Sequence, residues 1–246
     1  MSFRSFSIKF MSFITSTILL SGAANGSAGT PQTFVMTNLN VKNVLREFVY
    51  HMNATEQERA NYLQNKMTLF DFTTITNLDN WNELSDTVRT VGKSKATLVL
   101  QTTQVFQRAI FFTLLNPQPN GAGFAGVRTP VDFDLSAYKN ITITCRAQGN
   151  NNNYKVVLRH RNLTSNEDPT YEKFFTVPIS NEEFYTIDVP LADFKAYYRG
   201  QELPDAEPLD TTNITMFGLQ IYGGVYLPIK QSGVSSLEID TISATS

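Results

Sequence analysis

The stretch NITITCRAQGNNNNYKVVLRH, residues 140–160, carries the pattern that decides the fold. In its first half Ile141, Ile143 and Cys145 alternate with polar residues, and in its second half apolar residues again recur at every other position. A period of two is typical of β-strands that bury one face. The residues GNNNN at 149–153 tolerate the backbone angles of a tight turn. We therefore predict two strands joined by a hairpin, with Cys145 on the buried face.

Similar short apolar runs recur downstream of Met67, separated by segments rich in Pro, Gly and Asn. Many short strands with turn residues between them are typical of a β-sandwich or barrel. We expect further strands at residues 97–101, 109–115, 171–177, 184–189, 216–222 and 237–242. The only tryptophan, Trp81, is expected to pack in the core because large aromatic side chains dominate burial.

The residues GAGFAG at 121–126 match the spacing G-x-G-x-x-G of a dinucleotide-binding loop. That loop needs a strand running directly into the first glycine and a helix opening at the last. Pro117 and Pro119 separate the preceding apolar run from the first glycine, so no strand runs directly into it. Pro130 follows the last glycine too closely for a helix to open there. We predict no cofactor here. The glycines instead indicate a strand in which another backbone approaches closely.

The first 28 residues have the layout of a secretory signal peptide. Two basic residues precede an apolar run, small residues follow, and cleavage is expected after Ala24 or Ala28. The apolar run is too short for a membrane span. The competing interpretation is a mitochondrial presequence, because the segment is rich in Ser and the first acidic residue is Glu47. If the chain is secreted, Asn53, Asn140, Asn162 and Asn213 match the N-glycosylation acceptor sequence.

Residues 29–66 are predicted to form a short helical hairpin ahead of a β domain at 67–246. Apolar residues within 40–52 recur at helical spacing, so they lie in one stripe along the predicted helix. In the segment 55–66, Thr55 and Glu58 have the arrangement of a capping box.

The chain offers little for catalysis or metal binding. Its two histidines, His51 and His160, lie in no catalytic motif, and Cys145 is expected to be an inert buried thiol. We predict no metal site and no cofactor. Asp132 and Asp134 point to the same side of a strand, which keeps an extracellular glycan hydrolase as a remote alternative. The net charge of -2 argues against a nucleic-acid partner. In the stretch YKVVLRHR (154–161) the basic residues stand singly among apolar ones, so we expect them on the outer face of a strand.

An ordered set of motifs resembles the complex I intermediate-associated protein 30 family. The motifs span residues 69–244: LFDF (69–72), Trp81, SDTV (85–88), Ser94, GFAGVRT (123–129), DLSAY (134–138), YKVVLR (154–159), IDVPLADFKAYYRG (187–200), GLQIYGG (218–224) and SLEIDTISA (236–244). The resemblance implies a galactose-binding-like jelly-roll β-sandwich. It also implies, for members in mitochondria, a chaperone of respiratory complex I assembly without catalysis of its own.

Two positions depart from the family pattern. Arg89, Thr90 and Val91 stand where the family usually has a Met-Gly-Gly step, with Gly92 only afterwards. Phe184 stands where a tryptophan is common.

Binding is the predicted function. Jelly-roll domains of this kind commonly stack an aromatic ring on a sugar, and we expect Tyr197, Tyr198, Arg199 and Tyr222 to be the ligand-binding residues. The first hypothesis is a secreted, non-enzymatic glycoprotein that binds a carbohydrate or a protein. The alternative is a mitochondrial chaperone that holds complex I assembly intermediates.

Overall fold

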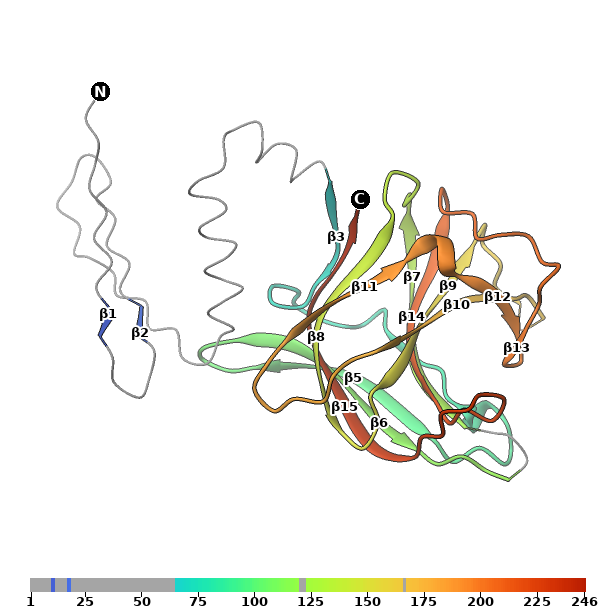
Figure 1. The fold of residues 1–246 in the computed structure, drawn as a ribbon, viewed down its shortest axis with the longest axis horizontal. Helices are drawn as coiled ribbons and strands as arrows, with labels where there is room; N and C mark the ends of the chain where they lie inside the picture. The colour runs from blue at the N-terminus through green and yellow to red at the C-terminus, as the bar shows by residue number, and fades with distance from the viewer. Residues whose placement is uncertain (1–9, 12–16, 19–64, 120–122, 166) are drawn as a thin grey trace. The chain divides into compact units, whose positions relative to one another are not determined.

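The structure, a computed structural model, describes residues 10–11, 17–18, 65–119, 123–165 and 167–246. The expected signal-peptide cleavage sites, the helical segment at 40–52, residues 55–64 of the second helical segment, His51 and Asn53 lie outside the described residues. The predicted end of that second segment at Lys66 is wrong, because Lys66 is the first residue of strand β3 (Lys66–Asp71). Two short strands, β1 (Phe10–Met11) and β2 (Thr17–Ile18), pair with each other. The rest of the described chain is a two-sheet β-sandwich, as predicted (Figure 1).

One sheet has seven antiparallel strands. Their spatial order is β13 (Gln201–Glu202), β12 (Lys195–Tyr198), β10 (Thr170–Thr176), β9 (Asn153–His160), β14 (Ile214–Tyr222), β7 (Phe124–Phe133) and β4 (Asn82–Glu83). The long strand β14 therefore lies between β9 and β7 and pairs with both. These two strands are not consecutive in the chain.

The other sheet is built around the longest strand, β15 (Gly233–Thr245). Its order is β11 (Tyr185–Pro190), β8 (Asn140–Gly149), β15, β6 (Gln107–Leu115) and β5 (Lys95–Thr102), and β3 (Lys66–Asp71) also pairs with β15. The C-terminus consequently lies beside β3 (Figure 1). Two 3-10 turns, η1 (Asp86–Val88) and η2 (Leu191–Asp193), lie in the connections.

The predicted strands are confirmed, and so is the predicted register of residues 140–147. Each apolar run expected from the period of two overlaps an observed strand. Ile141, Ile143 and Cys145 are all fully buried in β8, as expected for one face packed on the core. Strands β3, β12, β4 and β13 were not predicted. β4 and β13 have only two residues each and β12 only four, which is too short for a period to be recognised.

The predicted hairpin at 149–153 is wrong. Strand β8 pairs with β11 and β15, whereas β9 pairs with β10 and β14, so the connection crosses from one sheet to the other. The buried Asn151 anchors this crossing, because its side-chain amide lies 3.2 Å from the Ser235 hydroxyl of β15. A hairpin and a crossing have the same local pattern, since each flanking strand buries one face in both cases.

Aromatic side chains join the two sheets across the core. Phe70 of β3 and Phe217 of β14 have ring centroids 5.2 Å apart, and Trp81 packs on both at 5.1 and 6.2 Å. Farther along the core, Phe111 of β6 lies 6.4 Å from Tyr154 of β9. The expected role of Trp81 in packing is therefore confirmed.

The glycine-rich stretch contributes a strand, as predicted. Strand β7 begins at Phe124, and Gly126 is buried within it opposite Gln220 of β14. A Cβ atom on Gly126 would lie only 2.9 Å from the Leu219 carbonyl oxygen. This close backbone approach accounts for the glycine.

The burial of Cys145 predicts complete protection of its thiol in the native state. Burial raises the pKa of this thiol to about 12, so the reactive thiolate is scarce at mildly alkaline pH. We expect no labelling by a maleimide of the native chain and full labelling after denaturation, measured by intact mass. Rapid labelling of the folded protein would contradict the register of β8.

Candidate binding groove

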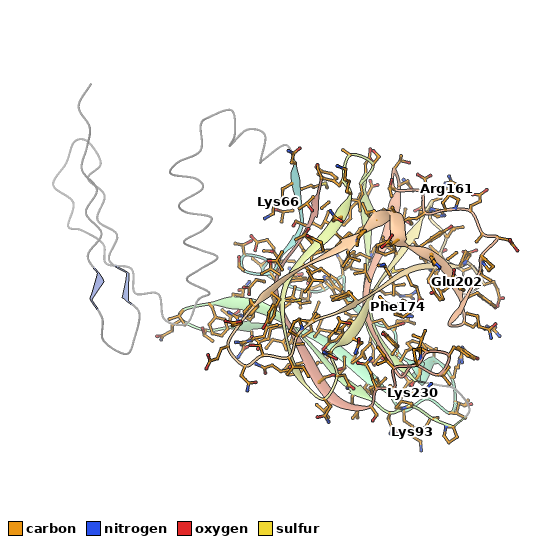
Figure 2. All side chains as sticks on the ribbon, in the orientation of Figure 1. Lys66, Lys93, Arg161, Phe174, Glu202 and Lys230 are labelled. Carbon is orange, nitrogen blue, oxygen red and sulfur yellow. The ribbon has the colours of Figure 1, made fainter. Side chains whose placement is uncertain are left out.

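A groove of about 730 Å³ lies over the outer face of the seven-stranded sheet. Side chains of a strand alternate between faces, so the core positions determine which residues reach this groove. In β9, Val156 and Leu158 are buried in the core, while Lys155 and Arg159 line the groove. Figure 2 labels Phe174 of β10 and Lys230 of the loop after β14, which both line it.

A glycine leaves the centre of the groove floor open. Gly218 of β14 lies on the groove face between Arg128 of β7 and Val157 of β9. One row along, the side chain of Gln220 covers Gly126, because a Cβ atom there would lie 3.0 Å from the Gln220 Cγ. A ligand or a neighbouring long side chain can therefore lie directly over β14 at Gly218.

Aromatic rings form one side of the groove. Phe174 packs edge-to-face against Tyr222, with centroids 5.0 Å apart and an interplanar angle of 86°. It makes a similar contact with Tyr197 at 5.7 Å and 78°. These rings therefore hold one another, and they do not form a row of parallel, open faces.

The groove is strongly cationic although the whole chain has a net charge of -2. Among the described residues, a single carboxylate, that of Glu172, lines it, together with six basic side chains: Arg89, Arg128, Lys155, Arg159, Arg199 and Lys230. Glu172 is already engaged, because its Oε2 lies 2.5 Å from Lys155 Nζ and its Oε1 accepts a hydrogen bond from Thr170. The other cations have no carboxylate counterpart within the described lining.

Arg159 is held in place by the loop that follows β9. Its side chain is only 6% exposed, and Nη1 donates to the carbonyl oxygens of Leu163 and Ser165 at 3.2 and 3.0 Å. Its Nε is buried without a hydrogen-bond partner. Burial, and then repulsion by Arg128, lower the pKa of Arg159.

Arg128 approaches Arg159 from the other side of β14. It is half-buried, and its guanidinium makes no hydrogen bond or ion pair with any described residue. The two arginines thus face the same groove with unused donors.

The loop after β14 forms an apolar rim. Val225 and Tyr226 are exposed there and line the groove. Gln231 fixes the base of the loop, since its Nε2 donates to the carbonyl oxygens of Tyr222 and Asn153 at 2.9 Å.

Asp86 holds the loop at the end of the groove where Leu84 and Arg89 contribute to the lining. This buried carboxylate accepts from the Ser94 amide at 2.8 Å and the Ser94 hydroxyl at 2.6 Å, and from the Phe124 amide at 3.3 Å. The backbone folds so tightly here that a Cβ on Gly92 would lie 2.0 Å from the Asp86 carbonyl oxygen. The departure from the family pattern thus still places a glycine where one is needed.

The sequence-predicted ligand residues are only partly brought together. Arg199 and Tyr222 line the groove, and Tyr197 packs behind Phe174. The Tyr198 hydroxyl instead donates to Glu167 at 2.6 Å. Arg199 adopts a positive φ of 52° in the turn between β12 and β13.

Sequence reasoning missed Arg128, Arg159 and Asp86. Both arginines lie on the outer face of a strand, and for Arg159 this was predicted from the stretch YKVVLRHR. The spacing of the residues did not indicate that this outer face forms a groove. Arg128, Arg159, Asp86 and Ser94 all occur in the family-like motifs, which was the available signal.

Three acceptor asparagines for glycosylation are described. Asn162 is exposed, whereas Asn140 and Asn213 are half-buried. The Asn213 side-chain oxygen accepts a hydrogen bond from the Arg161 amide at 3.1 Å. Occupancy of these sites stays a prediction.

The residues weighed for catalysis have structural partners. The imidazole of His160 is buried against Tyr171, and Nδ1 accepts from the Asp210 amide at 2.7 Å. Burial lowers the pKa of His160. Hydrogen bonds from Ser136 lower the pKa of Asp134, opposite to the raised pKa that a glycosidase general acid needs.

The described residues contain no group of three or more His, Cys, Asp or Glu side chains arranged to hold a metal ion. Within the same ranges, no helix has the length and apolar character needed to cross a membrane.

Comparison with known proteins gives a family match and a fold match. The model of the family described as complex I intermediate-associated protein 30 matches residues 70–239. A Schizosaccharomyces pombe protein named "Uncharacterized protein C9E9.15" is 28% identical over 146 residues, which is 56% of this chain and 64% of that protein's length. The chain thus spans less than two thirds of this curated relative.

Solved structures with the same fold include carbohydrate-binding modules. The family 11 module of the cellulosomal cellulase Lic26A-Cel5E of Clostridium thermocellum matches with a TM-score of 0.52 and 16% identity, over 73% of this chain and 94% of the module. The family 11 module from the same organism in complex with a β-1,3-1,4-mixed-linked tetrasaccharide matches with a TM-score of 0.53 and 17% identity, over 74% and 95%. These matches confirm the β-sandwich fold.

The contacts of Asp86 predict a large loss of stability in Gly92→Ala. The added Cβ must displace the Asp86 backbone, which disrupts its bonds to Ser94, so we expect a loss of about 2–4 kcal/mol in the free energy of unfolding. Urea denaturation measures it. The neighbouring exposed Lys93→Ala should change stability by less than about 0.5 kcal/mol. A wild-type midpoint for Gly92→Ala would refute the tight turn.

The environment of His160 predicts acid sensitivity. Because its pKa is lowered in the folded state, its contribution to stability is complete above about pH 6.5 and is lost as the pH falls below that value. In His160→Asn a neutral side-chain oxygen replaces Nδ1 as acceptor for the Asp210 amide. Thermal unfolding between pH 7 and 5 should therefore show a smaller decrease in Tm for the variant. Equal decreases would contradict this assignment.

Proposed function

The chain belongs to the complex I intermediate-associated protein 30 family, and from this we propose that it is a non-enzymatic binding protein that assists the assembly of respiratory complex I in mitochondria. The observation that carries the proposal is the family match over residues 70–239, which runs from β3 to β15 and so takes in nearly the whole sandwich. The groove lies within this matched region.

The chemistry of the groove is consistent with binding. Arginine and aromatic side chains, which it presents together, are the residue types enriched in protein interfaces. Its single carboxylate is neutralised by Lys155. In this proposal the protein holds an exposed segment of a partly built subunit and releases it when the neighbouring subunit binds.

The proposed location rests on the N-terminal segment read as a mitochondrial presequence. The Ser-rich composition and the late first acidic residue, Glu47, support that interpretation.

A secreted carbohydrate-binding module is the second candidate. The observation that favours it is the likeness in fold to modules of which one is described in complex with a tetrasaccharide, together with the aromatic side of the groove. Of the expected ligand residues, Arg199 and Tyr222 line the groove and would then contact the sugar. Asn53, Asn140, Asn162 and Asn213 would be candidates for N-linked glycans.

The two candidates predict different locations and partners for the full chain. With a C-terminal tag, expressed in its own cells, it is expected in the mitochondrial fraction and in association with partial complex I assemblies on native gels. Loss of the protein should raise the amount of such partial assemblies and lower that of the mature complex.

The opposite outcome is equally specific. A tagged chain that is recovered from the medium and shifts in mass on glycosidase treatment would defeat the assembly role and favour the secreted module.

A further inference from the structure

We propose that Arg128 and Arg159 form an anion-binding site in the groove that takes the carboxylates of an acidic peptide segment. This inference rests on the proposed function, because it identifies the kind of protein segment that the groove holds.

The pairing of the strands brings the two guanidinium groups together. Arg128 lies directly beside Gly218, and Arg159 lies beside Met216, two positions along the same strand on its other side. Because Gly218 has no side chain, nothing on β14 separates the two arginines at that row. At this separation Arg128 contributes, after burial, to the lowered pKa of Arg159, which the carboxylate of Asp168 partly offsets.

The hydrogen-bond donors of this pair are incompletely used. Arg159 is buried and fixed through Nη1, but its Nε has no partner. Arg128 has none among the described residues. A buried donor without an acceptor is costly, and two like charges in one groove add repulsion. An anion bound between them would offset this repulsion, and a guanidinium matches a carboxylate through two parallel hydrogen bonds.

No described carboxylate of the groove can take this place. Glu172 is committed to Lys155 and Thr170. The remaining cations are distributed along the groove, with Arg89 and Lys230 on its loops and Arg199 at the turn between β12 and β13. A ligand with several negative charges along an extended chain fits this distribution better than a single small anion.

Three further observations favour a peptide over a saccharide. The exposed Val225 and Tyr226 offer apolar contacts for side chains. The edge-to-face packing of Phe174 and Tyr222 does not present a flat stacking platform. The open floor over Gly218 leaves room for a main chain to pass close to the sheet.

The test uses the purified full chain and a short fluorescent peptide in which Glu alternates with Leu and Gly. A second peptide has Gln in place of every Glu. Binding is followed by fluorescence anisotropy. We expect the Glu peptide to bind, the Gln peptide to bind at least about tenfold more weakly, and added salt to weaken the Glu peptide preferentially.

The decisive variant is Arg128→Gln. The Arg128 side chain makes no hydrogen bond or ion pair with a described residue, and Gln keeps part of its aliphatic stem, so the variant should unfold close to the wild-type midpoint while its affinity for the Glu peptide falls about tenfold or more. In this variant the difference between the Glu and Gln peptides should nearly vanish, which identifies Arg128 as the partner of the carboxylate. Arg128→Lys should recover only part of the affinity, because lysine keeps the charge without the two-pronged donor.

Lys139→Gln is the matched control, since it removes the same charge from an exposed position outside the groove. It should leave affinity unchanged. An equal loss in Lys139→Gln would show general electrostatic attraction and overturn the site. Tight binding of inorganic phosphate, or binding of a neutral mixed-linked glucan oligosaccharide without the peptide, would overturn the peptide assignment.

The two proposals fail in distinguishable ways. Peptide binding is measured on the isolated protein, whereas the assembly role is measured by location and association in cells. Peptide binding that depends on Arg128 in a chain recovered from the medium would leave the anion site in place and remove the assembly role. Complex I association without peptide binding would do the reverse.

Discussion

The strict alternation of side chains in the seven-stranded sheet is the constraint on which the rest of the structure depends. Val156 and Leu158 of β9 are buried against the opposite sheet, so Arg159 must lie on the outer face. In β14, Phe217 is buried, so the next residue, Gly218, lies on that same outer face. A slip of one residue would exchange the two sets and place charges in the core. The energy that holds the sandwich together therefore also fixes the composition of the groove.

Local pattern was sufficient to predict the strands and their buried faces, and insufficient to predict which strands pair. The period of two in residues 140–147 and 154–160 is the same whether the two strands form a hairpin or face each other across the core. What distinguishes the alternatives is a polar contact far away in sequence, between Asn151 and Ser235. Such a contact does not change the periodicity of the sequence, so it cannot be predicted from it. The order of the strands around β14 could not be predicted for the same reason.

The candidate site was harder to predict than the fold because its residues act only in combination. Arg128 and Arg159 are each unremarkable outer-face residues of a strand, and the insertion of β14 with Gly218 at the matching row makes them a pair. Asp86 likewise gains its role from Ser94 and Phe124, which reach it from two other segments. The aromatic residues were easier to suspect, since their chemistry is apparent singly, and of these Tyr222 does line the groove.

Shared architecture does not transfer a ligand, because recognition depends on what the groove presents. The sandwich matches carbohydrate-binding modules in fold at low sequence identity, so the chemistry of its own groove has to decide between ligands. Here an overall acidic chain concentrates basic side chains on one face and leaves two guanidinium groups with free donors. Such a charge distribution attracts acidic partners from a distance and repels basic ones, while the apolar rim adds contact area once they bind. A neutral sugar is not attracted by this electrostatic field. An acidic segment of a protein is attracted by the basic side chains from a distance and then gains apolar contacts when it binds.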